Sequence, residues 1–327
     1  MATPGFNVLS TLSIYYTKTV NGKSVNVPIS SDFQRAITNI IYSKNMLSVS
    51  TLTIQFVDPT RKLLNTENIA RAGAIVSFDG REYVMVQLVK AGDQMQLVFE
   101  PKLVYMLRNK RSPKIDSGTS THVTEFIQRL VNEMNPNPAK PKYKLVAPNY
   151  TQIWSQISTE KIYSIPLSRG TATDAYEDSW TAMSRIAGGI AWRLWEDDGT
   201  IYFGPDEYWL GKIAGVQMPI NKINGTLGTK MQVIQEFTRK VQYMDFDWDV
   251  GKPLGQANVT CMLQDWNYKI GEIVKLSNVG PASGNWMVAS MQRDMFLPNA
   301  AMTLMVPMPY QQVINPTTAP SQPLPKF

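Results

Sequence analysis

The sequence predicts a β-rich α+β protein in which two antiparallel β-barrels flank a small α+β middle domain, followed by an extended proline-rich C-terminal arm. The main observation is a strand pattern that occurs twice, at residues 73–101 and 271–307. Each copy begins with a glycine and an apolar strand, continues with a strand that an aromatic residue leads (Tyr83 or Trp286), and ends in a third strand that closes on proline. Two such meanders indicate two similar β-domains in one chain.

The length and composition allow this division. A chain of 327 residues with 43% hydrophobic residues can bury two or three cores. We expect a first β-barrel domain at residues 1–107, a middle domain at 108–215 and a second β-barrel domain at 216–309. Residues 310–327 contain four prolines and few core-forming side chains, so we expect an extended arm there.

In the first domain, three elements precede the meander. Residues 8–16 alternate between apolar and polar and predict a strand with one buried face. After a cap at Ser31-Asp32, apolar residues recur at helical spacing from Phe33 to Ile41 and predict a helix. Residues 52–56 alternate again and predict a strand that stops before Asp58-Pro59.

The middle domain follows a local concentration of positive charge at Arg108, Lys110, Arg111 and Lys114. We interpret this run as a solvated linker; a nucleic-acid-binding module is the alternative, because the chain carries a net charge of +6. Thr121 then caps an amphipathic helix that continues to Met134. A second helix begins after Asp178-Ser179, and residues 191–205 form a hairpin around Asp198-Gly199. Residues 136–169 predict no element.

In the second domain, residues 241–250 alternate before the second meander, with Asp245, Asp247 and Asp249 on one face. Their spacing resembles the start of a calcium-binding loop, but Val250 stands where the sharp turn needs glycine. We therefore predict a strand that presents three carboxylates to water. Tyr83, Trp180, Trp248 and Trp286 lie on apolar faces and are predicted core residues.

Few residues suit catalysis. The single histidine, His122, is expected to face solvent at the start of a helix, and no nucleophile elbow accompanies it. Glu196 with Asp197 or Asp198 could form a glycosidase pair, but acidic residues are common in hairpin turns. The sequence thus predicts no catalytic residue, no metal site and no cofactor. Cys261 is the only cysteine, which excludes an internal disulfide and fits assembly in a reducing cytoplasm, and we expect no export signal or membrane span.

The segment from Glu177 to Pro205 resembles a signature of tail hub proteins of tailed bacteriophages, especially those of actinobacterial hosts. It contains an acidic-Ser-Trp helix start and a D-G-T-x-x-F hairpin. The DP turn before the first meander, the helix VTEFIQRLV and the segment GNWMV occur in the same order as in that family. The resemblance covers residues 47–307.

The resemblance implies a structural protein of the siphophage tail tip, similar to a baseplate hub. It implies a homotrimer whose two tail-tube-like barrels per chain form a pseudo-hexameric ring. The ring would join the tail tube and the distal tail protein to other tail-tip proteins, around a channel for the tape measure protein and, in transit only, DNA. Some relatives carry an added peptidase or lysozyme domain, and we find none in this sequence.

A channel that passes DNA should repel phosphate. We therefore expect Asp245, Asp247 and Asp249 on the channel side. The alternative function is a tail-tip cell-wall hydrolase or carbohydrate-binding protein, and a hydrolase would depend on Glu196 or Asp198.

Overall fold

The computed structural model describes residues 14–46, 48–78, 80–112, 122–148, 177–190, 192–205, 232–233, 243–247, 256–262, 269–276, 284–297 and 299–305. The N-terminal elements are β1 (Tyr15–Val20), β2 (Lys23–Pro28), α2 (Ser31–Ala36), β3 (Ile37–Asn45), β4 (Thr51–Val57), α3 (Lys62–Thr66), η1 (Asn68–Ala70), β5 (Ile75–Phe78), β6 (Arg81–Ala91) and β7 (Gln94–Pro101). The middle elements are α4 (Lys102–Arg108), α5 (Val123–Glu133), β8 (Lys144–Val146), α7 (Ser179–Gly189), β9 (Arg193–Asp197) and β10 (Thr200–Gly204). The C-terminal elements are β11 (Gln232–Val233), β12 (Tyr243–Asp247), β13 (Gln256–Met262), β14 (Ile273–Leu276), β15 (Gly284–Asp294) and β16 (Asn299–Met305).

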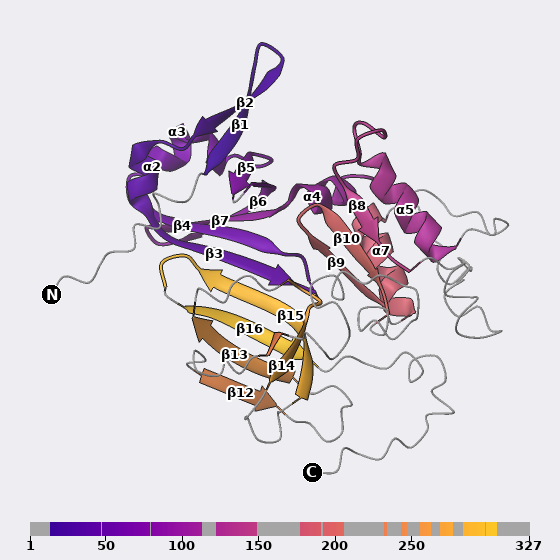
Figure 1. The fold of residues 1–327 in the computed structure, drawn as a ribbon. Coiled ribbons are helices and arrows are strands. Elements are labelled where there is room, and N and C mark those ends of the chain that lie inside the picture. The colour runs from indigo at the N-terminus through magenta and orange to yellow at the C-terminus, as the bar shows by residue number, and fades with distance from the viewer. Residues whose placement is uncertain are drawn as a thin grey trace, which may run out of the picture.

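These strands form one 13-stranded sheet and one three-stranded sheet (Figure 1). The large sheet has the order β12-β13-β16-β15-β3-β4-β7-β6-β5-β1-β2, while β14 pairs with β15 and β11. The small sheet has the order β8-β10-β9. The expected β-rich α+β class is confirmed. The described strands form an open sheet and not closed barrels, so two barrels stay a prediction, and the C-terminal arm lies outside the described residues.

The two meanders are equivalent strand by strand. We call β3 to β7 the first β-unit and β12 to β16 the second β-unit. The order β3-β4-β7-β6-β5 in the first unit corresponds to β12-β13-β16-β15-β14 in the second. Strands β6 and β15 both have 11 residues. The repeat seen in the sequence is therefore a repeat of topology.

The equivalence extends to register. Tyr83 is paired with Val76 of β5, and Trp286 is paired with Val274 of β14. Two residues further along, the pairing register shifts in both units. The shift lies between Met85 and Gln87 where β6 pairs with β7, and between Val288 and Ser290 where β15 pairs with β16. Tyr83 and Trp286 are 2% and 3% exposed. They occupy the same buried place in the two units, as the sequence predicted.

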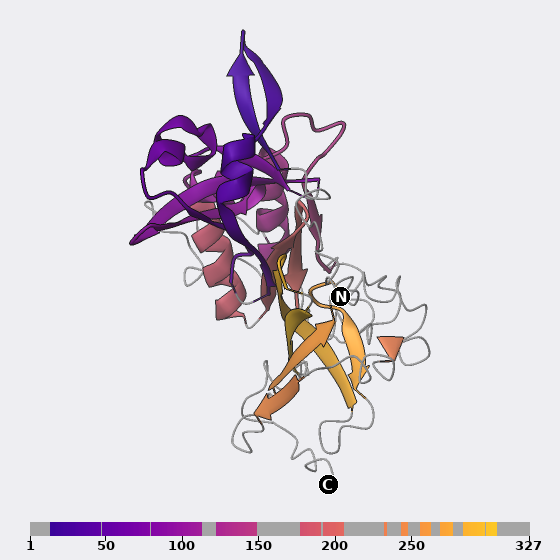
Figure 2. The same ribbon diagram turned by 90° about the vertical axis from the view of Figure 1, so that its left-hand side faces the viewer.

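The two units are joined edge to edge. The last five residues of β15, from Ser290 to Asp294, pair antiparallel with Asn45 to Ile41 of β3. The Met46 N–H donates to the Ala289 carbonyl at 2.8 Å and extends this ladder. In Figure 2 the two units lie at opposite ends of the molecule, and the hairpin β1–β2 projects away from the second unit.

Two N-terminal expectations need correction. The helix expected from Phe33 to Ile41 ends at Ala36, and Ile37 begins β3, because β-branched residues pack well in strands and β3 has a strand partner on each edge. Its cap is Ser30, whose Oγ accepts from the Phe33 N–H at 3.1 Å. The hairpin β1–β2 was not predicted, although Asn21-Gly22 has the two positive φ angles of a tight hairpin turn. Most of the strand expected at residues 8–16 lies outside the described residues.

The middle elements largely follow the sequence. Helix α5 is present and begins at a half-buried His122 as N-cap, not at Thr121. Helix α7 starts after Asp178, whose carboxylate accepts from the Thr181 N–H at 2.9 Å, and the hairpin β9–β10 turns at Asp198-Gly199. Helix α4 and strand β8 were not predicted. Strand β8 pairs in parallel with β10 and lies in the stretch for which no element was expected. No helix in the described part of the chain is long and apolar enough to span a bilayer.

Two hydrophobic cores result. One lies between the first β-unit and helix α2 and includes Phe33, Phe56 and Phe99. The other is shared: it includes residues of α5, α7, β9 and β10, and also residues of β15 and β16 of the second unit. Trp180 of α7 belongs to this shared core and is 7% exposed, as predicted, whereas Trp248 lies outside the described residues.

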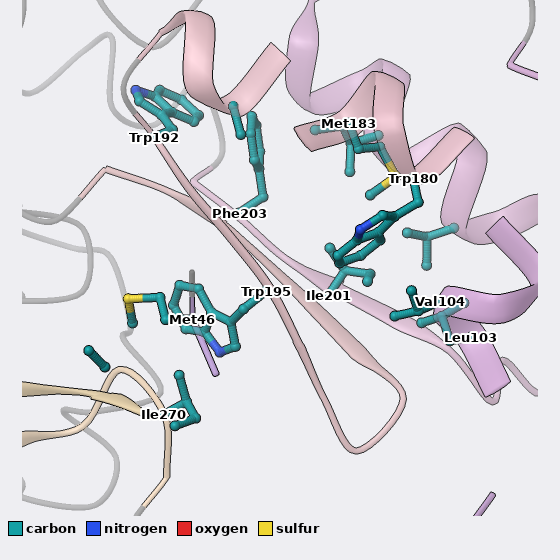
Figure 3. Packing of buried hydrophobic residues seen from close by; sticks show 14 of the residues in the cluster. Met46, Leu103, Val104, Trp180, Met183, Trp192, Trp195, Ile201, Phe203 and Ile270 are labelled. Atoms are coloured by element: carbon teal, nitrogen blue, oxygen red, sulfur yellow. The ribbon is translucent and has the colours of Figure 1, made fainter. Parts of the chain in front are cut away.

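Trp195 of β9 lies where the three parts of the chain meet. Figure 3 shows its ring beside Met46, which follows β3, and near Ile270, which precedes β14. Trp195 is 1% exposed. Gly271 has φ +84°, and a Cβ atom there would lie 2.8 Å from Trp195 Cζ2. The equivalent Gly73 has φ +80°, but its nearest neighbour, Tyr105 Oη, would be 3.7 Å away.

Replacing these glycines therefore separates backbone strain from packing. Gly73→Ala and Gly271→Ala should each lose about 1–2 kcal/mol of folding free energy from the positive φ. Gly271→Ala should lose more, because its methyl group displaces the Trp195 ring. Thermal unfolding checks this, and equal melting temperatures for the two variants would show that Trp195 does not constrain the junction.

Candidate functional site

A second contact between the first β-unit and the middle elements is ionic. The β9–β10 turn brings Asp197 to Lys44 near the end of β3 and to Arg81 at the start of β6. Lys44 Nζ lies 3.4 Å, and Arg81 Nη1 3.2 Å, from Asp197 Oδ1. The Lys44 and Asp197 side chains are each 8% exposed. We call Lys44, Arg81 and Asp197 the junction cluster.

Because the junction cluster is buried, the pKa of each member depends strongly on the charges beside it. Burial lowers the pKa of Lys44, and the nearby Asp197 carboxylate works in the opposite direction. Tyr42 extends the network, since its hydroxyl accepts from Arg81 Nη1 at 2.6 Å. Burial raises the pKa of Tyr42 to about 12, so this hydroxyl keeps its proton at neutral pH. The cluster fixes the middle hairpin on the first β-unit.

Glu196 stabilises the turn itself. Its Oε1 accepts from the Gly199 N–H at 2.7 Å, and the residue is 6% exposed. Burial raises the pKa of this carboxyl group to about 8, although the Gly199 hydrogen bond acts in the opposite direction. The three acidic residues proposed for a glycosidase pair thus have turn or ion-pair partners, since Arg81 Nε also lies 3.3 Å from Asp198 Oδ1.

A cavity of about 210 Å³ adjoins the cluster, between the first β-unit and the middle elements. Its lining contains both signs of charge: Arg81, Glu82, Lys102, Lys142, Glu196, Asp197 and Asp198. Glu82 pairs with Lys102 at 3.3 Å and also with Lys142. The lining has three cations and four acids, and the raised pKa of Glu196 keeps that acid protonated at neutral pH. The remaining three cations and three carboxylates balance, so the cavity is not selective for an anion or a cation by charge alone.

The basic segment is exposed at Arg108 and Arg111, as expected of a solvated run, but its described residues are held by neighbouring elements and do not form a linker. Arg108 ends α4 and pairs with Glu100, and Lys110 pairs with Glu133. Arg111 forms a β-bridge with Asp178. These contacts tie α4 to α5 and α7, and they occupy two of the cations that a nucleic-acid footprint would use. Lys114 lies outside the described residues.

Asp245 and Asp247 lie on β12, the last strand of the large sheet, where they are paired in register with Asn258 and Gln256 of β13. Asp249 lies outside the described residues. The channel-facing position of these acids therefore stays a prediction. His122 caps α5, and its backbone N–H donates to the Glu125 carboxylate at 3.2 Å.

The sequence did not reveal Lys44 or Arg81 as members of a site. One signal was present: Lys44 is a charged residue in a β-branched strand, and such residues are rarely buried without an ionic partner. Its partner is far away in the sequence, so spacing alone could not identify it.

Asp197→Asn should destabilise the fold by about 3–5 kcal/mol, because it leaves the buried Lys44 charge unpaired. The matched control is Asp198→Asn. The Asp198 side chain is 65% exposed, so solvent screens its contact with Arg81 and the loss should be about 0–1 kcal/mol. Chemical denaturation of the two variants measures the difference, and similar losses would contradict the assignment of Asp197 to the junction.

The raised pKa of Glu196 predicts that the stability of the fold depends on pH. The folded pKa of about 8 lies above the ordinary value of 4.5, so the folded state retains a proton that the unfolded state releases. The stabilisation is complete below about pH 4.5 and is lost as pH rises to about 8. Glu196→Gln removes this dependence, because an amide does not ionise in this range. The melting temperature of the natural chain should therefore fall relative to that of the variant between about pH 5 and pH 9. A constant difference would refute the raised pKa.

Known proteins resemble the chain in fold and not in sequence. No protein-family profile matches it, and no curated protein sequence matches it. The 43 kDa tail protein of prophage MuSo2 from Shewanella oneidensis is 9% identical, with a TM-score of 0.50 over 89% of this chain and 96% of that one. The E. coli c3393 protein is 10% identical, with a TM-score of 0.52 over 90% of this chain and 77% of that one.

The second of these is a component of the type VI secretion system that is structurally similar to the T4 bacteriophage tail proteins gp27 and gp5. At such low identity the likeness concerns the fold alone, and it does not support the expected actinobacterial host. It extends over 89% and 90% of this chain. The chain therefore shares the fold of a prophage tail protein and of a type VI secretion component that is similar to T4 tail proteins.

Proposed function

We propose that this protein is a structural tail hub of a tailed bacteriophage, located at the tail tip of the virion after assembly in the host cytoplasm. One observation carries the proposal: the chain contains the same β-unit twice, with equivalent register, joined edge to edge through β3 and β15. The fold likeness to a phage tail protein over most of the chain supports it. In this role the chain is not an enzyme.

The duplication suggests how the hub fits its neighbours. A homotrimer would contain six β-units, because each chain contributes two. Such a ring can match a sixfold tube on one side and present threefold symmetry on the other. It would join the tail tube and the distal tail protein to the remaining tip proteins, and it would surround a channel for the tape measure protein and then DNA.

The acids of the second β-unit have a role in this arrangement. We propose that Asp245, Asp247 and Asp249 face the channel, where carboxylates repel the phosphates of passing DNA. A structure of the assembled ring with all three directed away from the channel would reject this assignment without rejecting the ring.

A tail-tip cell-wall hydrolase or carbohydrate-binding protein is the alternative, and Glu196 favours it. A carboxyl group with a raised pKa that lines a cavity is typical of a general acid. Against this, the Asp197 carboxylate is neutralised by Lys44 and Arg81, and Glu196 is bound to its own turn. Turnover of purified peptidoglycan that Glu196→Gln abolishes would favour the hydrolase.

The hub proposal predicts the mass of the native assembly. The purified chain should form a species of three times its 36.8 kDa mass, because each subunit supplies one third of a ring. Native mass spectrometry or light scattering measures this mass. A monomer or an even-numbered oligomer at working concentration would contradict the proposal.

A further inference from the structure

The C-terminal half of β6 has an open edge. Strand β5 pairs with β6 only from Arg81 to Val84, whereas β7 pairs with β6 from Tyr83 to its end at Ala91. In the described part of the chain, no strand covers the other edge beyond Met85. We call residues 86–91 the β6 edge. It exposes three apolar side chains, with Val86, Leu88 and Val89 37%, 39% and 38% exposed. A long apolar edge strand normally has a partner, because it is otherwise a site for unwanted pairing.

In the second β-unit, the equivalent edge belongs to β15 and is covered by another strand. By register, Ala289 and Met291 of β15 are the equivalents of Val86 and Leu88. Ala289 and Met291 are 2% and 1% exposed. They lie where β3 pairs with β15, so the same edge that is open in the first unit is covered in the second.

The strand that covers it also has an equivalent. In the first unit, Tyr42 of β3 is paired with Leu52 of β4; in the second, Phe246 of β12 is paired with Ala257 of β13. Leu52 and Ala257 are in turn paired with the equivalent residues Phe99 and Leu304. Strand β12 therefore corresponds to β3. It ends the large sheet, and in the described part of the chain β13 is its only partner on the sheet.

We infer that the β6 edge pairs antiparallel with β12 of a second copy of this chain, so that the β15–β3 junction is repeated between chains. This inference rests on the proposed homotrimer and identifies its interface. Among the described residues, each chain has one open β6 edge and one open β12 edge, so copies add head to tail until a ring closes. The pairing provides backbone partners for both edges and covers the β6 edge, as β3 covers Met291.

The intrachain junction also gives the register. Gln292 is paired with Ser43, and Asp294 is paired with Ile41. The equivalent pairs between chains are Val89 with Asp247, and Ala91 with Asp245. Lys90 is then opposite Phe246 of the second copy. This places two of the three acids proposed for the channel directly at the interface between subunits.

A disulfide tests this register. In a closed ring of full-length Val89→Cys/Asp247→Cys chains, mild oxidation should link neighbours into a covalent trimer that a thiol reductant returns to single chains, since paired residues have Cβ atoms about 4.5–5.5 Å apart. The matched control is Ser43→Cys/Gln292→Cys, the equivalent pair within one chain, which should form its disulfide without any increase in mass. Val89→Cys/Tyr243→Cys is out of register and should not link. Cys261 is present in all three variants, so any disulfide that it forms contributes equally to each.

A charge in the interface provides a second measurement. Leu88→Asp should reduce the native assembly to single chains, whereas Phe296→Asp, at an exposed apolar position outside the β6 edge, should leave the assembly intact. A native trimer in which only the Ser43/Gln292 control forms its disulfide would overturn the pairing and leave the hub proposal standing. A trimer unaffected by Leu88→Asp would also overturn it. A chain that is monomeric without any substitution would overturn both.

Discussion

The arrangement of the whole molecule depends on strand β3 having a partner on each edge. Strand β4 of its own unit pairs on one side, and β15 of the second unit pairs on the other. This pairing makes one sheet from two β-units. The end of the same strand reaches the middle elements, because Lys44 pairs with Asp197 and Met46 contacts the shared core beside Trp195. One segment thus connects all three parts of the chain.

The two contacts at this junction have different physical roles. Trp195, Met46 and Ile270 exclude water and contribute the hydrophobic free energy of the contact. The buried pair of Lys44 and Asp197 contributes less net stability, because desolvation offsets its attraction, but a misplaced hairpin would leave two buried charges without partners. Packing therefore holds the middle elements in place, and the ion pair selects one orientation.

Local patterns predicted the parts of the fold that local residues determine. Both meanders were predicted because strand alternation and the leading residues Tyr83 and Trp286 repeat, and helix α5 was predicted from its apolar stripe. The segment from Ile37 to Ile41 was assigned to a helix because its apolar spacing fits a helix and a strand equally well. It forms a strand because β4 and β15, which are distant in the sequence, pair with it. The junction cluster was missed for the same reason, since Lys44 and Asp197 are far apart in the sequence. The hairpin at Asn21-Gly22, in contrast, had a local signal.

The central claim is that one β-unit, used twice per chain and joined by one kind of edge contact, forms a ring. An electron-microscopy map of the assembled tail tip, at a resolution that separates β-units, tests this claim most directly. We expect six equivalent β-units around a single axis, with contacts within and between chains alternating around the ring. Two layers of three units, or units that do not touch through their strand edges, would contradict the account.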